Sequence, residues 1–270
     1  MIVRALASDL DGTLLLDDAQ ELDGDVFDLV RELTERGTLF VAASGRQYAN
    51  LRRLFAPVKD QIAYVCENGC LTFYRGEMVS RELMDRDLGR ALIEDMLATE
   101  GTEVLVSGQR TSYILAGHRA FLHQMRDVVK NDVTPVDDLF DIDEPYFKIS
   151  IFEPEGLRDE DVWQRRYGDL CTVVTGGAQW LDMMPKGVGK ETGLLKLLAH
   201  VGVSPENTVM IGDNDNDVGA LRACGYPVAM RSGRPSAKEV AREQVDLVGG
   251  FMRELLRGER VPELTLGAAR

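Results

Sequence analysis

Short apolar runs alternate with amphipathic segments along most of the chain. The opening run at 2–7 and the run TLFVAAS at 38–44 contain few polar positions. A strand of that kind has both faces covered, as in a parallel sheet between helices. Between these runs, residues 25–36 show the 3.6-residue period of an amphipathic helix, and Gly37 is a suitable end for it. The pattern predicts strand and helix in alternation.

The middle of the chain shows a different pattern of strands and helices. Within residues 83–185 the short strands EVLVS and TSYILA form a predicted hairpin, and further strands and helices follow. The strand–helix alternation then returns. We therefore expect an α/β fold, with residues 1–82 and 186–270 forming a Rossmann-like parallel-sheet core and 83–185 an inserted α+β cap domain.

Charge excludes several kinds of partner. The chain has 31 basic and 45 acidic residues, for a formal net charge of −14. Nucleic acids and anionic membrane surfaces both select clustered positive charge. There is no apolar run of membrane-spanning length and no signal-peptide pattern at the start. We expect no nucleic-acid partner, no membrane partner and a cytoplasmic location. The four cysteines do not have the spacing of a metal site, and we expect them to be reduced, structural thiols.

Candidate chemistry begins where the first strand ends, in the segment DLDGTL. Asp9 and Asp11 are two residues apart, so on an extended backbone their carboxylates point the same way. Without a counter-charge, one of two close carboxylates is pushed towards its protonated form. Ligand sites of open α/β sheets lie at the carboxyl ends of strands. A plain turn is the competing interpretation, because Asp and Gly are common in turns.

Two further strand or helix ends carry suitable groups. Ser44 lies between a strand and a helix, where a hydroxyl and backbone N–H groups suit a phosphate; the alternative is a helix cap. Lys190 begins a helix, where its charge opposes the helix dipole, and this indicates a use for the ammonium group. Lys186 is the competing candidate.

The segment GDNDND at 212–217 is the strongest signal after the opening. Asp213, Asp215 and Asp217 follow a predicted strand, but the spacing does not fit an EF-hand loop. The spacing suits a site in which one acid binds a small hard cation directly. A second acid lies behind the first, and the amide of Asn216 is also near the cation. Magnesium is bound in this way, through few carboxylates.

Taken together, these segments resemble the haloacid dehalogenase-like phosphatases, specifically Cof-type hydrolases with a large α/β cap. The resemblance spans the chain in order and rests on DLDGTL at 9–14, ASGR at 43–46, ENG at 67–69, GVGKETG at 187–193 and GDNDND at 212–217. One departure is VAMRSGRPSAKEVA at 228–241, where the family commonly has a Gly-Asn-Ala run. We expect this departure to affect local packing or specificity more than phosphoryl transfer.

The resemblance implies a role for each residue. Asp9 would be the nucleophile that forms an aspartyl phosphate, and Asp11 the general acid and base. Asp9, Asp213 and the backbone carbonyl of Asp11 would hold Mg²⁺. Behind the metal, Asp217 would orient metal-bound water or Lys190, and Asn216 would belong to the same second layer. Ser44, Lys190 and the backbone amides near Gly12 would bind the phosphate oxygens. Arg46 and Asn68 would contact the substrate.

The function that the resemblance implies is Mg²⁺-dependent hydrolysis of phosphate monoesters of small metabolites, with sugar phosphates favoured. The cap would select the leaving group, and the protein would be a monomer or a homodimer. Two alternatives stay open: a phosphomutase or phosphotransferase using the same aspartate, and a non-catalytic metal- or phosphate-binding regulator. The second is disfavoured, because a binder has no need of an acid two residues from a nucleophile.

Overall fold

A computed structural model of the chain describes residues 1–17, 19–158, 160–260 and 263–267. The chain divides into two compact units: a core unit, Met1–Ser80 with Lys190–Arg270, and an inserted unit, Arg81–Gly189. The sequence pattern placed the inserted segment at 83–185.

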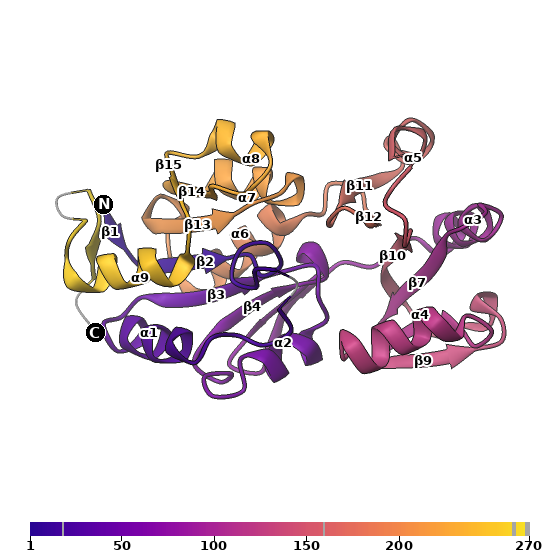
Figure 1. Cartoon of the computed structure of the whole chain (residues 1–270), viewed down its shortest axis with the longest axis horizontal. Helices are drawn as coiled ribbons and strands as arrows, with labels where there is room; N and C mark the ends of the chain where they lie inside the picture. The colour runs from indigo at the N-terminus through magenta and orange to yellow at the C-terminus, as the bar shows by residue number, and fades with distance from the viewer. Residues whose placement is uncertain (18, 159, 261–262, 268–270) are drawn as a thin grey trace. The chain divides into compact units, whose positions relative to one another are not determined.

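An eight-stranded sheet forms the centre of the core unit (Figure 1). In spatial order its strands are β15 (Glu243–Val245), β14 (Tyr226–Met230), β13 (Thr208–Gly212), β2 (Ala5–Ser8), β3 (Leu39–Ala43), β4 (Ala63–Cys66), β5 (Leu71–Tyr74) and β6 (Glu77–Arg81). Neighbours from β15 to β4 run parallel, and β5 is antiparallel to β4. The expected α/β class with a parallel-sheet core is confirmed.

Helices cover both faces of this sheet (Figure 1). They are α1 (Gly24–Glu35), α2 (Tyr48–Leu54), α6 (Lys190–Val201), α7 (Val218–Ala223), α8 (Pro235–Val240) and α9 (Val248–Arg257). On one face, α6, α7 and α8 share an apolar cluster with Ala5 and Ala7, which are alternate residues of β2. On the other, α1 packs on β3 and α9. All of β2 is buried, which explains why its sequence shows no polar alternation.

The opening apolar run is divided between two sheets. Its first part, β1 (Ile2–Val3), pairs in parallel with β16 (Thr265–Leu266), and only β2 enters the main sheet. Between them, the backbone N–H of Arg4 donates to Asn207 O at 2.8 Å. The prediction of one strand over 2–7 is therefore wrong, because a partner near the far end of the chain takes its first two residues.

The inserted unit has its own sheet and apolar core. Its strands in spatial order are β11 (Cys171–Thr175), β12 (Trp180–Pro185), β10 (Tyr146–Phe152), β7 (Glu103–Gly108), β8 (Ser112–Leu115) and β9 (Val133–Val136). All neighbours are antiparallel except β8 and β9. Two helices, α3 (Arg86–Leu97) and α5 (Glu160–Tyr167), pack on one face, and α4 (Arg119–His123), continued by a π-helical turn at Gln124–Val128, packs on the other. The predicted hairpin of EVLVS and TSYILA is confirmed as β7 and β8.

Two further expectations concern the whole chain. All four cysteines are free and buried, as the sequence suggested. In the described part of the chain, no helix is both long enough and apolar enough to cross a bilayer.

Candidate active site

Four neighbouring parallel strands of the core sheet end at the residues that the sequence marked. In the order β13, β2, β3, β4, these strands are followed by Asp213, Asp9, Ser44 and Glu67. The carboxyl ends of parallel strands meet at one edge of a sheet, so these residues gather there. Lys190, the first residue of α6, comes from another part of the chain.

Lys190 joins two buried carboxylates. Its Nζ lies 2.6 Å from Oδ1 of Asp9 and 2.7 Å from Oδ1 of Asp217. The exposed fraction of each side chain is small: 1% for Lys190, 7% for Asp9 and none for Asp217. The competing candidate, Lys186, instead donates to the backbone carbonyl of Gly168 in the inserted unit.

The loop after β13 is held by its own last residue. Oδ2 of Asp217 accepts from the backbone N–H of Asp213 at 3.0 Å and of Asn214 at 3.1 Å. From the loop after β2, Thr13 donates through Oγ1 to Oδ1 of Asp213 at 2.8 Å. As a result, Asp9, Asp213 and Asp217 each offer an oxygen within 4.8 Å of the others.

The charges of this cluster do not balance. Burial raises the pKa of Asp9 well above its ordinary value, the charge of Asp217 raises it further, and Lys190 opposes both. Burial and the charge of Asp217 also raise the pKa of Asp213. Burial alone would lower the pKa of Lys190, but Asp217 and Asp9 together raise it, so the ammonium stays charged. Three carboxylates thus share one ammonium.

A divalent cation fits this excess of negative charge. Carboxylate oxygens are the ligands that Mg²⁺ prefers in proteins. Asp217 already accepts three hydrogen bonds, one from Lys190 and two from backbone N–H groups. Asp9 and Asp213 are therefore the better candidates for ligands, and Asp217 is placed to hold them in position.

Gly12 lets the two loops approach each other closely. Its φ is +80°, and a Cβ at this position would lie 2.5 Å from Oδ2 of Asp213. Its own N–H, one of the amides near Gly12 that we expected to face the phosphate, donates to Leu15 O at 2.9 Å. The structure therefore gives Gly12 a steric role beside Asp213.

We expect Gly12→Ala to displace the Asp213 carboxylate and to lower kcat/KM about 100-fold, because small misplacements of catalytic groups have effects of this size. The matched control is Gly76→Ala, at a glycine with the same φ of +80° and nothing within 4 Å of its Cβ position. Both variants carry a backbone strain of about 1–2 kcal/mol. Steady-state kinetics separate them: equal losses of activity in both would contradict the steric role.

Asp11 is paired differently from Asp9. Its two oxygens accept from Nε of Arg46 at 2.9 Å and from Nη2 at 2.6 Å. The Asp11 side chain is half exposed, and Nη1 of Arg46 also donates to Asn50 Oδ1 at 3.3 Å. The two carboxylates of DLDGTL thus have a separate cation each, and Asp11 lies outside the cluster of three acids.

The remaining candidates connect the loops. Oγ of Ser44 accepts from the backbone N–H of Arg46 at 3.1 Å, and the residue that caps α2 is Gln47, so Ser44 is not that helix's N-cap. Asn216 donates through Nδ2 to Oδ1 of Asn68 at 3.0 Å. In the described part of the chain, Oδ1 of Asn216 is buried without a hydrogen-bond partner.

A family model matches most of the chain. The model of a family described as haloacid dehalogenase-like hydrolase matches residues 6–248, a range that includes the candidate site residues. The chain is a haloacid dehalogenase-like hydrolase.

Relatives of this hydrolase include named phosphatases. It is 26% identical over 238 residues to the 5-amino-6-(5-phospho-D-ribitylamino)uracil phosphatase YbjI of Escherichia coli K12, covering 86% of each chain. It is 25% identical over 264 residues to phosphoglycolate phosphatase 1 of Saccharolobus solfataricus, covering 96% of this chain and 98% of that one. Phosphoric monoester hydrolysis is the activity that these relationships support.

A solved structure shows the same fold. The sugar phosphatase BT4131, of haloacid dehalogenase subclass IIB, superposes with a TM-score of 0.80 at 20% identity. The match covers 93% of this chain and 98% of that one.

The hydrolase also has residues at the site that the sequence analysis did not single out. In the segment that departs from the family pattern, Arg234 donates through Nη1 to Asp215 Oδ2 at 2.6 Å and through its backbone N–H to Asp213 O at 2.7 Å. Ser236 donates to the other oxygen of Asp215. These contacts hold the acidic loop, and the expectation that the segment affects local packing or specificity more than phosphoryl transfer stays a prediction. No spacing rule would have paired Arg234 with an acid on another loop.

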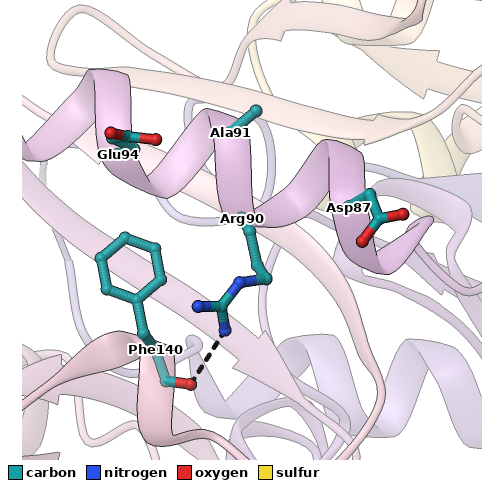
Figure 2. Close-up of a pocket in the computed structure, with 5 residues that line it drawn as sticks. All are labelled: Asp87, Arg90, Ala91, Glu94 and Phe140. Carbon is teal, nitrogen blue, oxygen red and sulfur yellow. Dashed lines mark hydrogen bonds between the residues drawn. The ribbon is translucent and has the colours of Figure 1, made fainter.

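A separate hollow of about 460 Å³ lies on α3 in the inserted unit (Figure 2). It is lined by Asp87, Arg90, Ala91, Glu94 and Phe140. The guanidinium of Arg90 lies 4.8 Å from the centre of the Phe140 ring and donates to the Phe140 carbonyl at 3.2 Å. The hollow contains none of the residues that the sequence marked.

Proposed function

We propose that this hydrolase is a Mg²⁺-dependent phosphatase that acts on phosphate monoesters of small metabolites through an aspartyl-phosphate intermediate. The observation that carries the proposal is the cluster of Asp9, Asp213 and Asp217, with Asp9 and Asp217 buried and Lys190 bound to Asp9, at the carboxyl edge of the parallel sheet. A nucleophilic carboxylate needs nearby positive charge to receive a dianionic phosphate.

The proposed reaction has two steps. In the first, a carboxylate oxygen of Asp9 attacks phosphorus, the bond from phosphorus to the ester oxygen breaks, and Asp11 gives its proton to that oxygen. In the second, water attacks the phosphorus of the aspartyl phosphate, Asp11 takes the proton of that water, and phosphate leaves with the Asp9 carboxylate restored. To carry that proton, Asp11 gives up one of its two hydrogen bonds from Arg46, and its half-exposed side chain can exchange a proton with solvent, whereas the Asp9 side chain is buried.

The other residues stabilise charge or hold position. The ammonium of Lys190 and the hydroxyl of Ser44 are the groups that we assign to the oxygens of the transferring phosphoryl group. Mg²⁺, held by Asp9 and Asp213, would supply electrostatic stabilisation of those oxygens when bound. We assign Arg46 to holding Asp11, because its guanidinium accommodates both oxygens of that carboxylate.

The first test is phosphate release from p-nitrophenyl phosphate with Mg²⁺ and with a chelator. We expect turnover with Mg²⁺, less than about one hundredth of it after chelation, and recovery when Mg²⁺ is restored. Turnover that survives chelation would contradict the metal assignment. Isomerisation of a sugar phosphate without free phosphate would identify the mutase alternative.

Sugar phosphates are the substrate class that we favour. The Escherichia coli relative is named for a phosphoribityl compound, in which the phosphate sits on a polyol chain, and the Saccharolobus relative for phosphoglycolate. A panel of hexose, pentose and polyol phosphates beside phosphoglycolate tests the preference. A kcat/KM for phosphoglycolate above that of every sugar phosphate would overturn it.

We further propose that the inserted unit, Arg81–Gly189, is the cap that selects the leaving group. It has its own sheet and apolar core, so it is a suitable unit for exchange. Replacing it with the corresponding segment of the Escherichia coli relative should transfer that relative's substrate ranking. Hydrolysis of p-nitrophenyl phosphate shows that the chimera is folded, and an unchanged ranking in an active chimera would contradict the role.

A further inference from the structure

The turn Glu67–Gly69 after β4 has an unusual backbone. Its three residues have positive φ: 49° at Glu67, 52° at Asn68 and 97° at Gly69. The two non-glycine residues are nevertheless buried, at 4% and 1% exposed. Left-handed backbone at non-glycine residues is costly and persists where the surrounding structure enforces it.

The main chain of this turn holds the loop that carries Ser44. The N–H of Asn68 donates to Ser44 O at 3.0 Å, and the N–H of Glu67 donates to Arg46 O at 3.1 Å. In return, the N–H of Ser44 donates to Val65 O at 2.8 Å. These bonds fix the start of the loop after β3 against the end of β4.

Gly69 is in contact with the helix that begins at Lys190. A Cβ at Gly193, in the first turn of α6, would lie 2.8 Å from the Cα of Gly69. Gly69 and Gly193 thus allow the backbone of the turn to touch the backbone of α6, one helical turn from Lys190. The position of the Lys190 end of α6 is set partly by this turn.

The side chain of Asn68 reaches a third loop. Its Oδ1 accepts from Nδ2 of Asn216, next to Asp217, at 3.0 Å. Its amide also packs on Gly45, where a Cβ would lie 3.2 Å from Nδ2 of Asn68. The turn therefore touches the loop of Ser44, the helix of Lys190 and the loop of Asp213 and Asp217.

We propose that Asn68 is a positioning residue, which sets the distance between the phosphate-binding loop of Ser44 and the acidic loop of residues 212–217. This inference rests on the proposed function, and it replaces the substrate-side role that the resemblance implied for Asn68. The Asn68 side chain would act through Asn216 and its left-handed backbone through Ser44.

The test uses Asn68→Gly, since glycine accepts the left-handed backbone and keeps the N–H bond to Ser44, so only the amide is lost. We expect kcat/KM to fall about 10- to 100-fold, by the same factor for an aryl phosphate and for glycerol phosphate. Asn216→Ala, which breaks the same bond from the other side, should show a similar loss, and the double variant no more than the larger single loss. The control is Arg75→Gly, at an exposed residue with φ of 51°, and it should keep wild-type kinetics.

Hydrogen exchange by mass spectrometry gives a readout independent of activity. In Asn68→Gly, the segment 212–217 should exchange about 10-fold faster while α9 is unchanged, because the loop has lost its tether to the turn. A loss that depends on the leaving group, an additive double variant, or unchanged exchange at 212–217 would overturn the proposal. If the wild type shows no turnover, the proposed function fails, but the exchange experiment still decides whether Asn68 holds the loop.

Discussion

Asp9→Asn is expected to lower kcat by about 10⁴-fold or more, since removing a nucleophile has effects of this order in other enzymes. The amide keeps the size and shape of the carboxylate but does not form the acyl phosphate bond. Stability should change little, because the substitution removes one negative charge from a cluster in which three carboxylates share one ammonium, and Lys190 keeps its ion pair with Asp217. The measurements are kcat with p-nitrophenyl phosphate and the melting temperature.

The matched control is Asp28→Asn, at a carboxylate whose side chain is 81% exposed. It should leave both quantities unchanged. Acid quenching during turnover, followed by peptide mass spectrometry, should find a phosphoryl group on the wild-type peptide that contains Asp9 and none on the variant. A variant with more than about one tenth of wild-type activity would show that another group is the nucleophile.

Lys190→Met should affect both stability and activity. Removing the ammonium leaves the buried carboxylates of Asp9 and Asp217 without their shared cation. Breaking a buried ion pair in this way costs about 3–5 kcal/mol. For a chain of this size, we expect a drop in melting temperature of about 6–20 °C. Activity should fall about 100-fold or more, because the transferring phosphoryl group loses a preorganised positive charge.

Lys196→Met is the control for this second prediction, since it makes the same substitution at an exposed position of the same helix. It should change neither quantity. Adding Asp217→Asn to Lys190→Met should recover part of the melting temperature, because one unpaired charge is removed. A stable Lys190→Met protein, or a double variant less stable than the single one, would contradict the account of the buried cluster.

Much of this site could be predicted from the sequence because its residues follow the ends of strands. The strands themselves are visible as apolar runs, and their carboxyl ends are where an α/β sheet binds ligands. For this reason Asp9, Ser44 and Asp213 could be named as candidates without coordinates. The inserted unit was recognisable for a related reason: its antiparallel hairpins show a different pattern from the strand–helix alternation around them.

Ion pairs between residues far apart in the chain were harder to predict from the sequence. The sequence indicated that Asp9 and Asp11 need a counter-charge. The roles implied by the resemblance were a metal on Asp9 and a proton on Asp11. In the structure, Lys190 binds the first and Arg46 the second. The sequence marked Lys190 and Arg46 as candidates, but it did not pair either cation with a particular carboxylate, because the pairing depends on which loops meet.

The sequence by itself determined the α/β class, the alternation of strands and helices and the positions of the acids, and it predicted an insertion, since each is encoded in local periodicity and in residue type. Only the tertiary structure decided that β13, β2, β3 and β4 are neighbours, that Asp217 holds Lys190, and that Asn68 meets Asn216. Those contacts join segments far apart in the chain. They follow from how the crossovers pack on the sheet, and a local pattern of residues carries no information about such distances.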